Sequence, residues 1–532
     1  MENMLGVMID CSRNAVMSVE SIKKFAGIIK KMGYNTLMLY TEDTFELDNR
    51  PLFGYMRGRY TKAELREIDD YCNELGIEVI PCMQTLAHLE GIFKWGDFAE
   101  VNDYNNILLI GEEKTYELID DMFRNLSESF RSRKIHIGMD EAWMVGLGKY
   151  REKNGIVDRF DMINGHLNRV CEIAKKYDYK PMIWHDMFCS LAINDIMYYY
   201  EDGDYDLSRI PENEKLMPKD VSIVYWDYYK TEYKDYDRIM NICKKFNRDM
   251  IFAGGAWTWR GFSPDNDFSI KTTEPALRAC KDHGIKDVII TIWGDDGAEC
   301  SPYAVLPSLM YSAEAYKGNT DMDSIKAKFK EIVGADFDSF MILDKINTPG
   351  GKHNFKSHPN KYLLYNDLFT GLSDHKCTEA DDEYYKELAQ EIKNAADKGE
   401  YAYIFDTLEK MAEVLSVKTN LGNRTRSAYK KNDKDELKKI ALDYDVVIKK
   451  LEEFHALLQK QWFIDNKPYG FDIQDIRFGG MILRIKSCRD RLLSYIAGTI
   501  SEIPELSEEL LEKDCCWSWG RSVSPNTISH IL

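Results

Sequence analysis

Two neighbouring carboxylates, Asp140 and Glu141, stand directly after a short and mostly apolar stretch, residues 135–139. A stretch of this kind bounded by polar residues is typical of a buried strand, so both acids are expected at a strand end. Burying two carboxylic acids side by side is unfavourable unless they are paired or take part in chemistry. Asp140 and Glu141 are therefore the first candidate catalytic residues.

The elements that position these acids repeat regularly along the first 316 residues or so. Strand-like segments alternate with stretches whose apolar residues recur at helical spacing, and several of these stretches end in a glycine just before the next strand. The segments expected as strands are 5–10, 36–40, 77–83, 135–139, 181–184, 221–226, 250–253 and 288–293, and helices are expected at 19–32, 63–75, 115–130, 163–177 and 275–283. Eight apolar strands separated by helices predict a (β/α)₈ TIM barrel, an α/β fold, over residues 1–318.

The sequence changes character beyond residue 318. It becomes charged and rich in helical patterns without obvious strands, and helices are expected at 384–396, 403–415, 433–461 and 481–497. This change predicts a second, α-helical C-terminal domain over residues 319–532.

Composition narrows the classes of function. The chain has 532 residues, 70 of them basic and 89 acidic, and its net charge of −19 argues against nucleic acid or an anionic membrane surface as a partner. The N-terminal residues lack the pattern of a secretion signal, and no apolar run reaches the roughly 18 residues that cross a bilayer. We therefore expect a cytoplasmic protein. Its 12 cysteines show no repeated metal-binding spacing, and no nucleotide-binding glycine motif occurs, so no metal and no cofactor are expected.

Tryptophans stand at several of the expected strand ends, which meet at one face of such a barrel. They are Trp184, Trp226, Trp257 together with Trp259, and Trp293. Indole rings pack against the weakly polar C–H face of a sugar, while acids and an arginine can bind its hydroxyls. A single tryptophan could equally cap the barrel core, but four or more at one face favour a pocket for a neutral sugar.

These residues together resemble a known family. The Asp140–Glu141 pair after the fourth strand, Arg13 after the first, His88 after the third, and Asp295 two residues beyond Trp293 are similar to the marks of family 20 glycoside hydrolases, the β-N-acetylhexosaminidases. The resemblance covers about residues 5–316. It departs from the commonest pattern in lacking a domain before the barrel, in having Trp-Gly-Asp where Trp-x-Glu is usual, and in its helical C-terminal region. The chain thus resembles the compact intracellular bacterial branch of the family.

The resemblance implies a substrate-assisted mechanism without a cofactor. In this family the 2-acetamido oxygen of the substrate, not an enzyme carboxylate, attacks the anomeric carbon. Glu141 is then expected to be the general acid that protonates the leaving oxygen and later the base that activates water. Asp140 is expected to orient the acetamide and to stabilise the positive charge that develops on it. The substrate would be an oligosaccharide that ends in a β-linked N-acetylglucosamine or N-acetylgalactosamine.

The resemblance also implies binding roles. Arg13 and Asp295 would bind hydroxyls at the non-reducing end and make the enzyme exo-acting, although Arg13 could instead form a salt bridge across the barrel mouth. His88 would hydrogen-bond Glu141 with support from Asp43 or Glu42, although it could simply be a packed histidine.

The aromatic residues would hold the acetamide and the ring. Trp184, Trp226 and Trp293 would form the wall of the acetamide pocket. The hydroxyl of Tyr228, rather than that of Tyr225 or Tyr229, is expected to hold the acetamido oxygen. Strand alternation places the Tyr228 side chain on the same face as that of Trp226. Trp257 would stack on the leaving-group sugar or on the ring itself.

Two other interpretations remain open from the sequence. A metal-dependent barrel hydrolase could use His88, His136, His185 and Asp186, but the chain has no closely paired histidines on one strand. A non-catalytic sugar-binding protein would keep the tryptophans and would not need two adjacent acids. No catalytic residue is expected from the C-terminal domain; the alternative is that a residue of this domain closes the site. A homodimer is expected for an intracellular enzyme of this size.

Overall fold

Eight parallel strands close into a barrel in the computed structural model, which describes residues 3–193, 207, 210, 217–295, 297–349, 358–395 and 397–511. The strand order around the barrel is β1-β2-β3-β6-β7-β8-β9-β10, and β10 pairs with β1. The strands are β1 (Leu5–Asp10), β2 (Thr36–Tyr40), β3 (Glu78–Cys82), β6 (Lys134–His136), β7 (Lys180–Trp184), β8 (Ser222–Trp226), β9 (Met250–Gly255) and β10 (Asp287–Ile292). The predicted barrel is confirmed.

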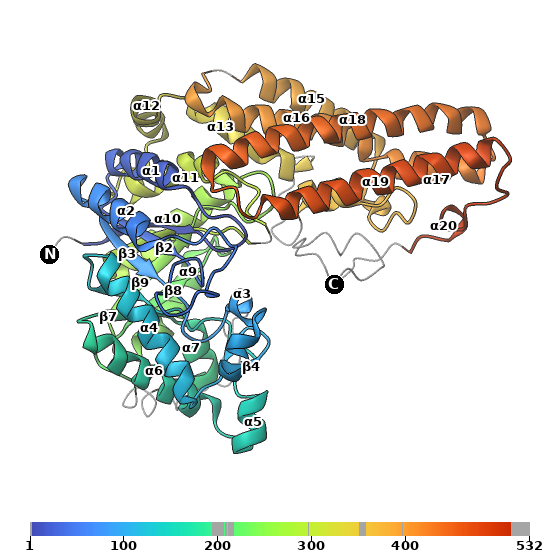
Figure 1. Cartoon of the computed structure of the whole chain (residues 1–532). Coiled ribbons are helices and arrows are strands. Elements are labelled where there is room, and N and C mark those ends of the chain that lie inside the picture. The colour runs from blue at the N-terminus through green and yellow to red at the C-terminus, as the bar shows by residue number, and fades with distance from the viewer. Residues whose placement is uncertain are drawn as a thin grey trace.

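Helices cover the outside of the barrel (Figure 1). They are α1 (Val19–Met32), α2 (Lys62–Glu74), α4 (Glu113–Ser129), α6 (Arg159–Lys176), α7 (Asp186–Ile193), α9 (Tyr233–Lys244), α10 (Asn266–His283) and α11 (Leu306–Tyr316). Helix α1 illustrates why they form: the Ser18 side chain caps its first turn, and Gly33 ends it with a left-handed φ of 107°. Shorter elements lie in the loops at the mouth, namely α3 (Glu90–Phe93), β4 (Asn102–Tyr104), β5 (Ile107–Leu108) and α5 (Lys149–Asn154).

Strand alternation divides the barrel core into two layers. Side chains that point outward pack under the helices, whereas those that point inward fill the barrel. The inner cluster includes Met8, Met38 and Ile80, and it also contains Trp184, Trp257, Trp259 and Trp293. The tryptophans therefore belong to the inner core, and the functional question is which of them also face the mouth.

A helical region follows the barrel. It consists of α12 (Met322–Val333), α13 (Phe337–Ile342), α14 (Pro359–Tyr365), α15 (Glu379–Asn394), α16 (Ala402–Lys418), α17 (Leu421–Lys430), α18 (Lys434–Asp465), α19 (Phe471–Ile496) and α20 (Pro504–Ser507). The long helices α18 and α19 run side by side away from the barrel (Figure 1). Each of the four helices predicted here overlaps one of these, although residues 396 and 512–532 lie outside the described part.

Ten cysteines fall within the described ranges, and all ten are buried free thiols. No helix within the same ranges combines the length and the apolar character needed to cross a bilayer.

Candidate active site

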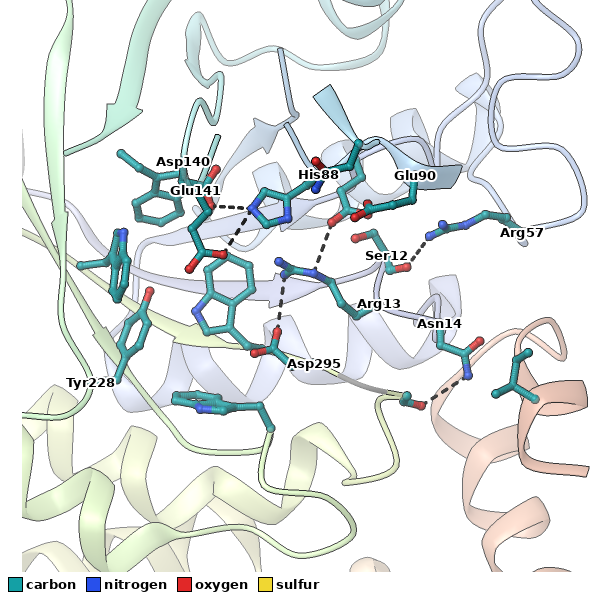
Figure 2. Close-up of a pocket in the computed structure, with 18 of the residues that line it drawn as sticks. Ser12, Arg13, Asn14, Arg57, His88, Glu90, Asp140, Glu141, Tyr228 and Asp295 are labelled. Carbon is teal, nitrogen blue, oxygen red and sulfur yellow. Dashed lines mark hydrogen bonds and ion pairs between the residues drawn. The ribbon is translucent and has the colours of Figure 1, made fainter. Parts of the chain in front are cut away.

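A cavity of about 560 Å³ opens at the carboxyl ends of the barrel strands (Figure 2). This is the face where barrels of this type carry their chemistry. Every site residue predicted from the sequence except Trp257 lines the cavity. The lining is Ser12, Arg13, Asn14, Glu42, Arg57, His88, Glu90, Asn106, Asp140, Glu141, Trp184, Trp226, Tyr228, Tyr229, Trp259, Trp293, Asp295, Gly297, Ile473 and Arg477.

An irregular turn brings both Asp140 and Glu141 to the cavity. In a continuing strand two successive side chains would point to opposite faces. Strand β6 instead stops at His136, and Gly138, Met139 and Glu141 have φ values of 71°, 71° and 50°. These left-handed conformations turn the chain, and the Glu141 N–H is held by Asp186 Oδ2 at 2.9 Å. Strand β6 is therefore shorter than the predicted segment 135–139.

Gln84 supports this turn from the neighbouring loop. Its Nε2 donates to Asp140 Oδ1 at 2.8 Å, and its Oε1 accepts the Met139 N–H at 3.3 Å. A Cβ at Gly138 would lie 1.9 Å from Gln84 Oε1, so only glycine fits between the turn and the amide. One glutamine thereby fixes both the backbone of the turn and the Asp140 carboxylate.

His88 lies between the two acids. Its Nε2 is 3.3 Å from Asp140 Oδ2 and 3.6 Å from Glu141 Oε2. Burial alone would lower the pKa of His88, but the two carboxylates outweigh it and raise the pKa to about 9. Burial would likewise raise the pKa of Asp140, yet His88, Gln84 and Arg13 lower it to about 2. Asp140 is thus held ionised, whereas the Glu141 side chain is 46% exposed at the mouth.

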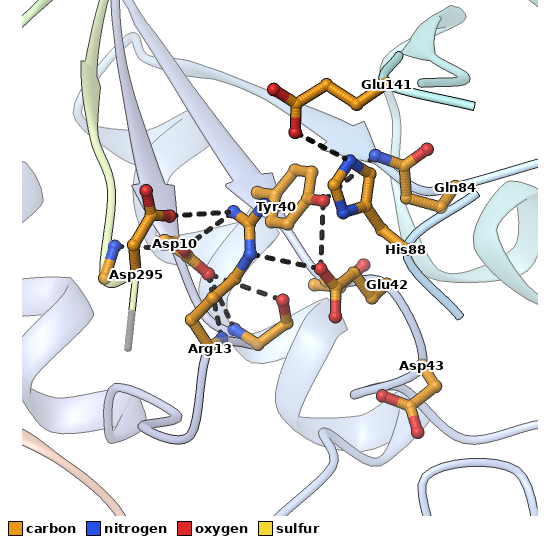
Figure 3. A network of polar contacts seen from close by, with 12 residues as sticks. Asp10, Arg13, Tyr40, Glu42, Asp43, Gln84, His88, Glu141 and Asp295 are labelled. Atoms are coloured by element: carbon orange, nitrogen blue, oxygen red, sulfur yellow. Dashed lines mark hydrogen bonds and ion pairs between the residues drawn. The ribbon is translucent and has the colours of Figure 1, made fainter. Parts of the chain in front are cut away.

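Asp43 and Glu42, the two acids expected to support His88, each form an ion pair with an arginine. Figure 3 shows where both acids lie. Asp43 pairs with Arg57 at 3.4 Å. Glu42 accepts the Tyr40 hydroxyl at 3.0 Å and pairs with Arg13, and His88 is close enough to favour its charged form. Burial nevertheless raises the pKa of Glu42 to about 7.

Arg13 is fixed by aromatic rings and carboxylates. Its guanidinium carbon lies 4.6 Å from the centre of the Tyr40 ring and 4.8 Å from that of Trp293. Its nitrogens are 3.0 Å from Asp10, 3.2 Å from Glu42 and 3.9 Å from Asp295 (Figure 3). Arg13 therefore forms salt bridges at the barrel mouth and lines the cavity as well, so the two interpretations of this residue are compatible.

Aromatic side chains form the wall beside the acids. Trp226 and Tyr228 stack with ring centres 5.4 Å apart, and Trp184 lies 6.1 Å from Trp293. The Tyr228 hydroxyl points toward the Glu141 carboxylate (Figure 2). Tyr225, in contrast, donates its hydroxyl to Asp227 at 2.9 Å in the core.

The placement of Trp257 corrects the sequence prediction. Trp257 is 1% exposed, stacks on Trp259 at 4.5 Å and donates its indole N–H to the Tyr228 carbonyl at 3.0 Å. Trp259 lines the cavity in its place. The reason is that strand β9 ends at Gly255, after which Trp257 forms an isolated bridge with Asp265, so strand alternation no longer decides which indole faces the mouth.

Two cavity residues come from the helical region and were missed. Ile473 and Arg477 belong to the first turns of α19, far beyond the barrel in sequence. An isoleucine and an arginine in an amphipathic helix carry no local signal of a site. Arg57, Glu90 and Asn106, from the loops after β2 and β3, were also missed because no strand end marks them.

The histidines considered for a metal site are engaged in other contacts. His136 Nδ1 accepts the Gly138 N–H at 3.1 Å, and its ring packs 4.1 Å from Trp184. Burial lowers the pKa of both His136 and His185 to about 3. Within the ranges that the structure describes, no three His, Cys, Asp or Glu side chains are grouped so that they could hold a metal ion.

Comparisons with known proteins bear on both parts of the chain. The family model for the catalytic domain of glycosyl hydrolase family 20 matches residues 5–242. The model for the glycoside hydrolase 20C C-terminal domain matches residues 338–515.

Individual relatives are distant. Hexosaminidase D of Homo sapiens is 24% identical over 231 residues, which are 41% of this chain and 43% of that protein. A probable beta-hexosaminidase of Arthroderma benhamiae is 22% identical over 382 residues, 61% of this chain and 60% of that protein. The chain spans about half the length of the hexosaminidase D proteins that it matches. The crystal structure of a GH20 exo β-N-acetylglucosaminidase from Vibrio harveyi aligns with a TM-score of 0.47 and 15% identity over 64% of this chain and 58% of that one.

Proposed function

Because the chain belongs to glycoside hydrolase family 20, we propose that it is an exo-acting β-N-acetylhexosaminidase. It removes terminal β-linked N-acetylglucosamine or N-acetylgalactosamine from oligosaccharides by substrate-assisted hydrolysis. The observation that carries the proposal is the pair of adjacent acids in different surroundings at one cavity. Asp140 is buried and kept ionised, whereas Glu141 is half-exposed at the mouth. Environments that differ in this way suit two carboxylates to two roles.

Glu141 acts on the glycosidic oxygen. In the first step it protonates the leaving oxygen while the acetamido oxygen of the substrate attacks the anomeric carbon, which gives an oxazolinium ion. In the second step the Glu141 carboxylate takes a proton from the water that opens this ion. His88, which lies 3.6 Å from Glu141, is placed to orient that carboxylate through both steps.

Asp140 acts on the acetamide. Its carboxylate accepts the amide N–H and stabilises the positive charge that develops as the ring closes. Its low pKa supports this role, because a permanently ionised carboxylate is needed at neutral pH. The Tyr228 hydroxyl, which points toward the acids, holds the acetamido oxygen in line for attack (Figure 2).

The remaining groups bind the sugar ring. Trp184, Trp226 and Trp293 enclose the acetamide methyl, and Trp259 supplies the apolar surface previously expected of Trp257. Arg13 and Asp295 hold the hydroxyls of the non-reducing end. Their ion pair is long, at 3.9 Å, which leaves both groups hydrogen-bonding capacity for a substrate.

The test compares chromogenic aryl β-glycosides of N-acetylglucosamine, N-acetylgalactosamine and glucose with the wild type and Glu141→Gln. The N-acetyl substrates should be cleaved and the β-glucoside left intact, because glucose lacks the reacting amide. Glu141→Gln should lower kcat by roughly 10²–10⁴-fold. Efficient β-glucoside cleavage would point to a glycosidase that uses two carboxylates. Loss of activity in the presence of a chelator would point to a metal-dependent enzyme. Binding of N-acetylglucosamine without turnover would identify a sugar-binding protein.

We also propose that the protein is a cytoplasmic homodimer that binds neither nucleic acid nor membranes. Helices α18 and α19 expose several large apolar side chains, among them Leu442, Phe463 and Leu483, and exposed apolar surface can mark an interface. Free buried thiols are compatible with a reducing compartment. Sedimentation equilibrium would test the dimer, and fractionation of the source cells would test the location.

A further inference from the structure

One end of the cavity is formed by the helical region. Ile473 and Arg477 lie four residues apart on α19, which places them one turn from each other on the same side of the helix, and both line the cavity. No other residue of the helical region that the structure describes is part of this lining. The cavity is therefore complete only when α19 packs against the barrel.

The start of α19 is tied to the two loops that carry Arg13 and Asp295. Asn14 Nδ2 donates to the Gly470 carbonyl at 2.9 Å and to the Gly297 carbonyl at 3.4 Å. Gln474 Nε2 donates to the same Gly297 carbonyl at 3.4 Å. These bonds link the loop after β1, the loop after β10 and the first turn of α19, so the three segments hold one another in position.

Arg477 is held by a buried carboxylate. Its Nη1 is 3.1 Å from Glu299 Oε1, and Lys361 Nζ lies 3.0 Å from the same oxygen. The Glu299 side chain is 1% exposed. A Cβ at Gly297 would lie 2.7 Å from Arg477 Nη1, so the guanidinium packs directly on the backbone two residues beyond Asp295. Arg477 is thus a fixed part of the wall, not a mobile surface side chain.

The order of residues along the cavity gives this wall a function, provided that the proposed function holds. Figure 2 shows Tyr228 and Glu141 on one side, then Asp295 and Arg13, and then Asn14 beside the helix of the C-terminal region. The reaction occurs at Glu141, and Arg13 and Asp295 bind the non-reducing end. We propose that Ile473 and Arg477 of α19 close the cavity beyond the non-reducing end and thereby exclude sugars that carry a substituent there.

The chemistry of the two side chains fits exclusion. Ile473 offers only methyl and methylene groups, so a further sugar would lose its hydration there without gaining a hydrogen bond. The Arg477 guanidinium is held by Glu299 against the backbone of Gly297, so it is not free to move aside for a further sugar. The helical region therefore acts as a stop that restricts cleavage to unsubstituted terminal residues, and Ile473 and Arg477 are specificity-determining residues.

The test uses aryl β-N-acetylglucosaminides that are unsubstituted or carry an O-methyl group at position 3, 4 or 6. The measured quantity is the ratio of kcat/KM for the unsubstituted substrate to that for each methylated one. The wild type should discriminate strongly at one position at least. Ile473→Ala and Arg477→Ala should each lower that ratio by roughly tenfold. This is the low end of the discrimination that a pocket achieves against one extra methylene-sized group on a substrate. The position that responds identifies the hydroxyl that faces α19.

The matched control is Ile476→Ala. Ile476 lies on the same helix, is 69% exposed and does not line the cavity, so its removal should leave both the ratio and the basal activity unchanged. Arg477→Lys, which keeps a cation near Glu299, should retain more discrimination than Arg477→Ala. Wild-type ratios in the folded Ile473→Ala protein, or an equal shift in Ile476→Ala, would overturn the inference. A wild type that fails to cleave the unsubstituted substrate would defeat the proposed function instead.

Discussion

Single residues at this site differ mainly in what surrounds them. Asp140 has a glutamine amide, an imidazole and a guanidinium to keep it charged, whereas the half-exposed Glu141 carboxylate lies 3.6 Å from the His88 imidazole at the open mouth. The two acids should therefore respond differently to the leaving group of the substrate. A 2,4-dinitrophenolate leaves without a proton, while an ordinary sugar does not.

Substrates whose leaving groups differ in their need for a proton should distinguish the roles of Glu141 and Asp140. Glu141→Gln should lose much less activity on a dinitrophenyl β-N-acetylglucosaminide than on a disaccharide, because the first needs no general acid for departure. Asp140→Asn should lose about 10²–10³-fold in kcat on both substrates with little change in KM. The reason is that the acetamido oxygen must attack the anomeric carbon whichever group leaves. Steady-state kinetics of the four combinations decide the matter. Equal losses in Glu141→Gln on both substrates would remove Glu141 from the acid role.

The second prediction concerns the charge on His88. Its pKa in the folded protein, about 9, exceeds the usual 6.5, so its ion pairs stabilise the fold fully below pH 6.5 and lose this effect as the pH rises through 9. The difference in free energy of unfolding between wild type and His88→Gln should therefore shrink by about 2 kcal/mol between pH 7.5 and 9.5.

Urea unfolding at the two pH values measures this difference. His166 provides the control, because burial lowers its pKa to about 4 and it is neutral at both pH values. The wild type and His166→Gln should differ by the same amount at pH 7.5 and 9.5. A constant difference for His88→Gln as well would mean that His88 is not charged in the folded protein.

At the scale of elements, the turn after β6 determines whether two adjacent acids can serve one cavity. The third prediction compares two glycines with the same backbone angle, Gly138 with φ of 71° and Gly284 with φ of 72°. Gly284→Ala meets no atom within 4 Å and should cost only the left-handed conformation, about 1 kcal/mol. Gly138→Ala must also displace Gln84, so it should destabilise the fold further and lower kcat by moving Asp140. Equal stabilities and an unchanged kcat would show that Gln84 does not position the acid.

The strands of the barrel could be predicted from the sequence, whereas the segments that follow them could not. Short apolar runs that alternate with stretches of helical spacing located all eight strands. They stand out locally because each buried strand is covered by its own helix. The predictions failed where regular geometry ends. Strand β6 stops early at a left-handed turn, and beyond β9 the chain bends so that Trp259 lines the cavity and Trp257 is buried behind it. Alternation describes a strand but says nothing about the residues that follow it.

At the scale of the whole molecule, the site depends on a contact that no local pattern reveals. Ile473 and Arg477 lie more than 170 residues beyond Asp295, and only the packing of α19 on the barrel brings them to the cavity. Hydrophobic periodicity predicts a helix over 481–497, which overlaps α19 but leaves out the first turns that carry Ile473 and Arg477. It does not predict which surface of the barrel receives it, because that depends on pairings such as Arg477 with Glu299.

The last prediction tests how firmly the two parts are joined. Glu299→Ala would remove the carboxylate that Lys361 and Arg477 share, and removing one partner of a buried ion pair typically costs about 3–5 kcal/mol. Glu400→Ala breaks another contact between the parts, the pair of Glu400 with Lys24 of α1 at 3.0 Å, but this pair is exposed and should contribute below about 1 kcal/mol. Calorimetry should show a large decrease in Tm for Glu299→Ala only, with the barrel and the helical region still unfolding in one transition. Equal decreases for both variants, or two separate transitions in the wild type, would mean that the helical region is attached too loosely to act as a wall of the cavity.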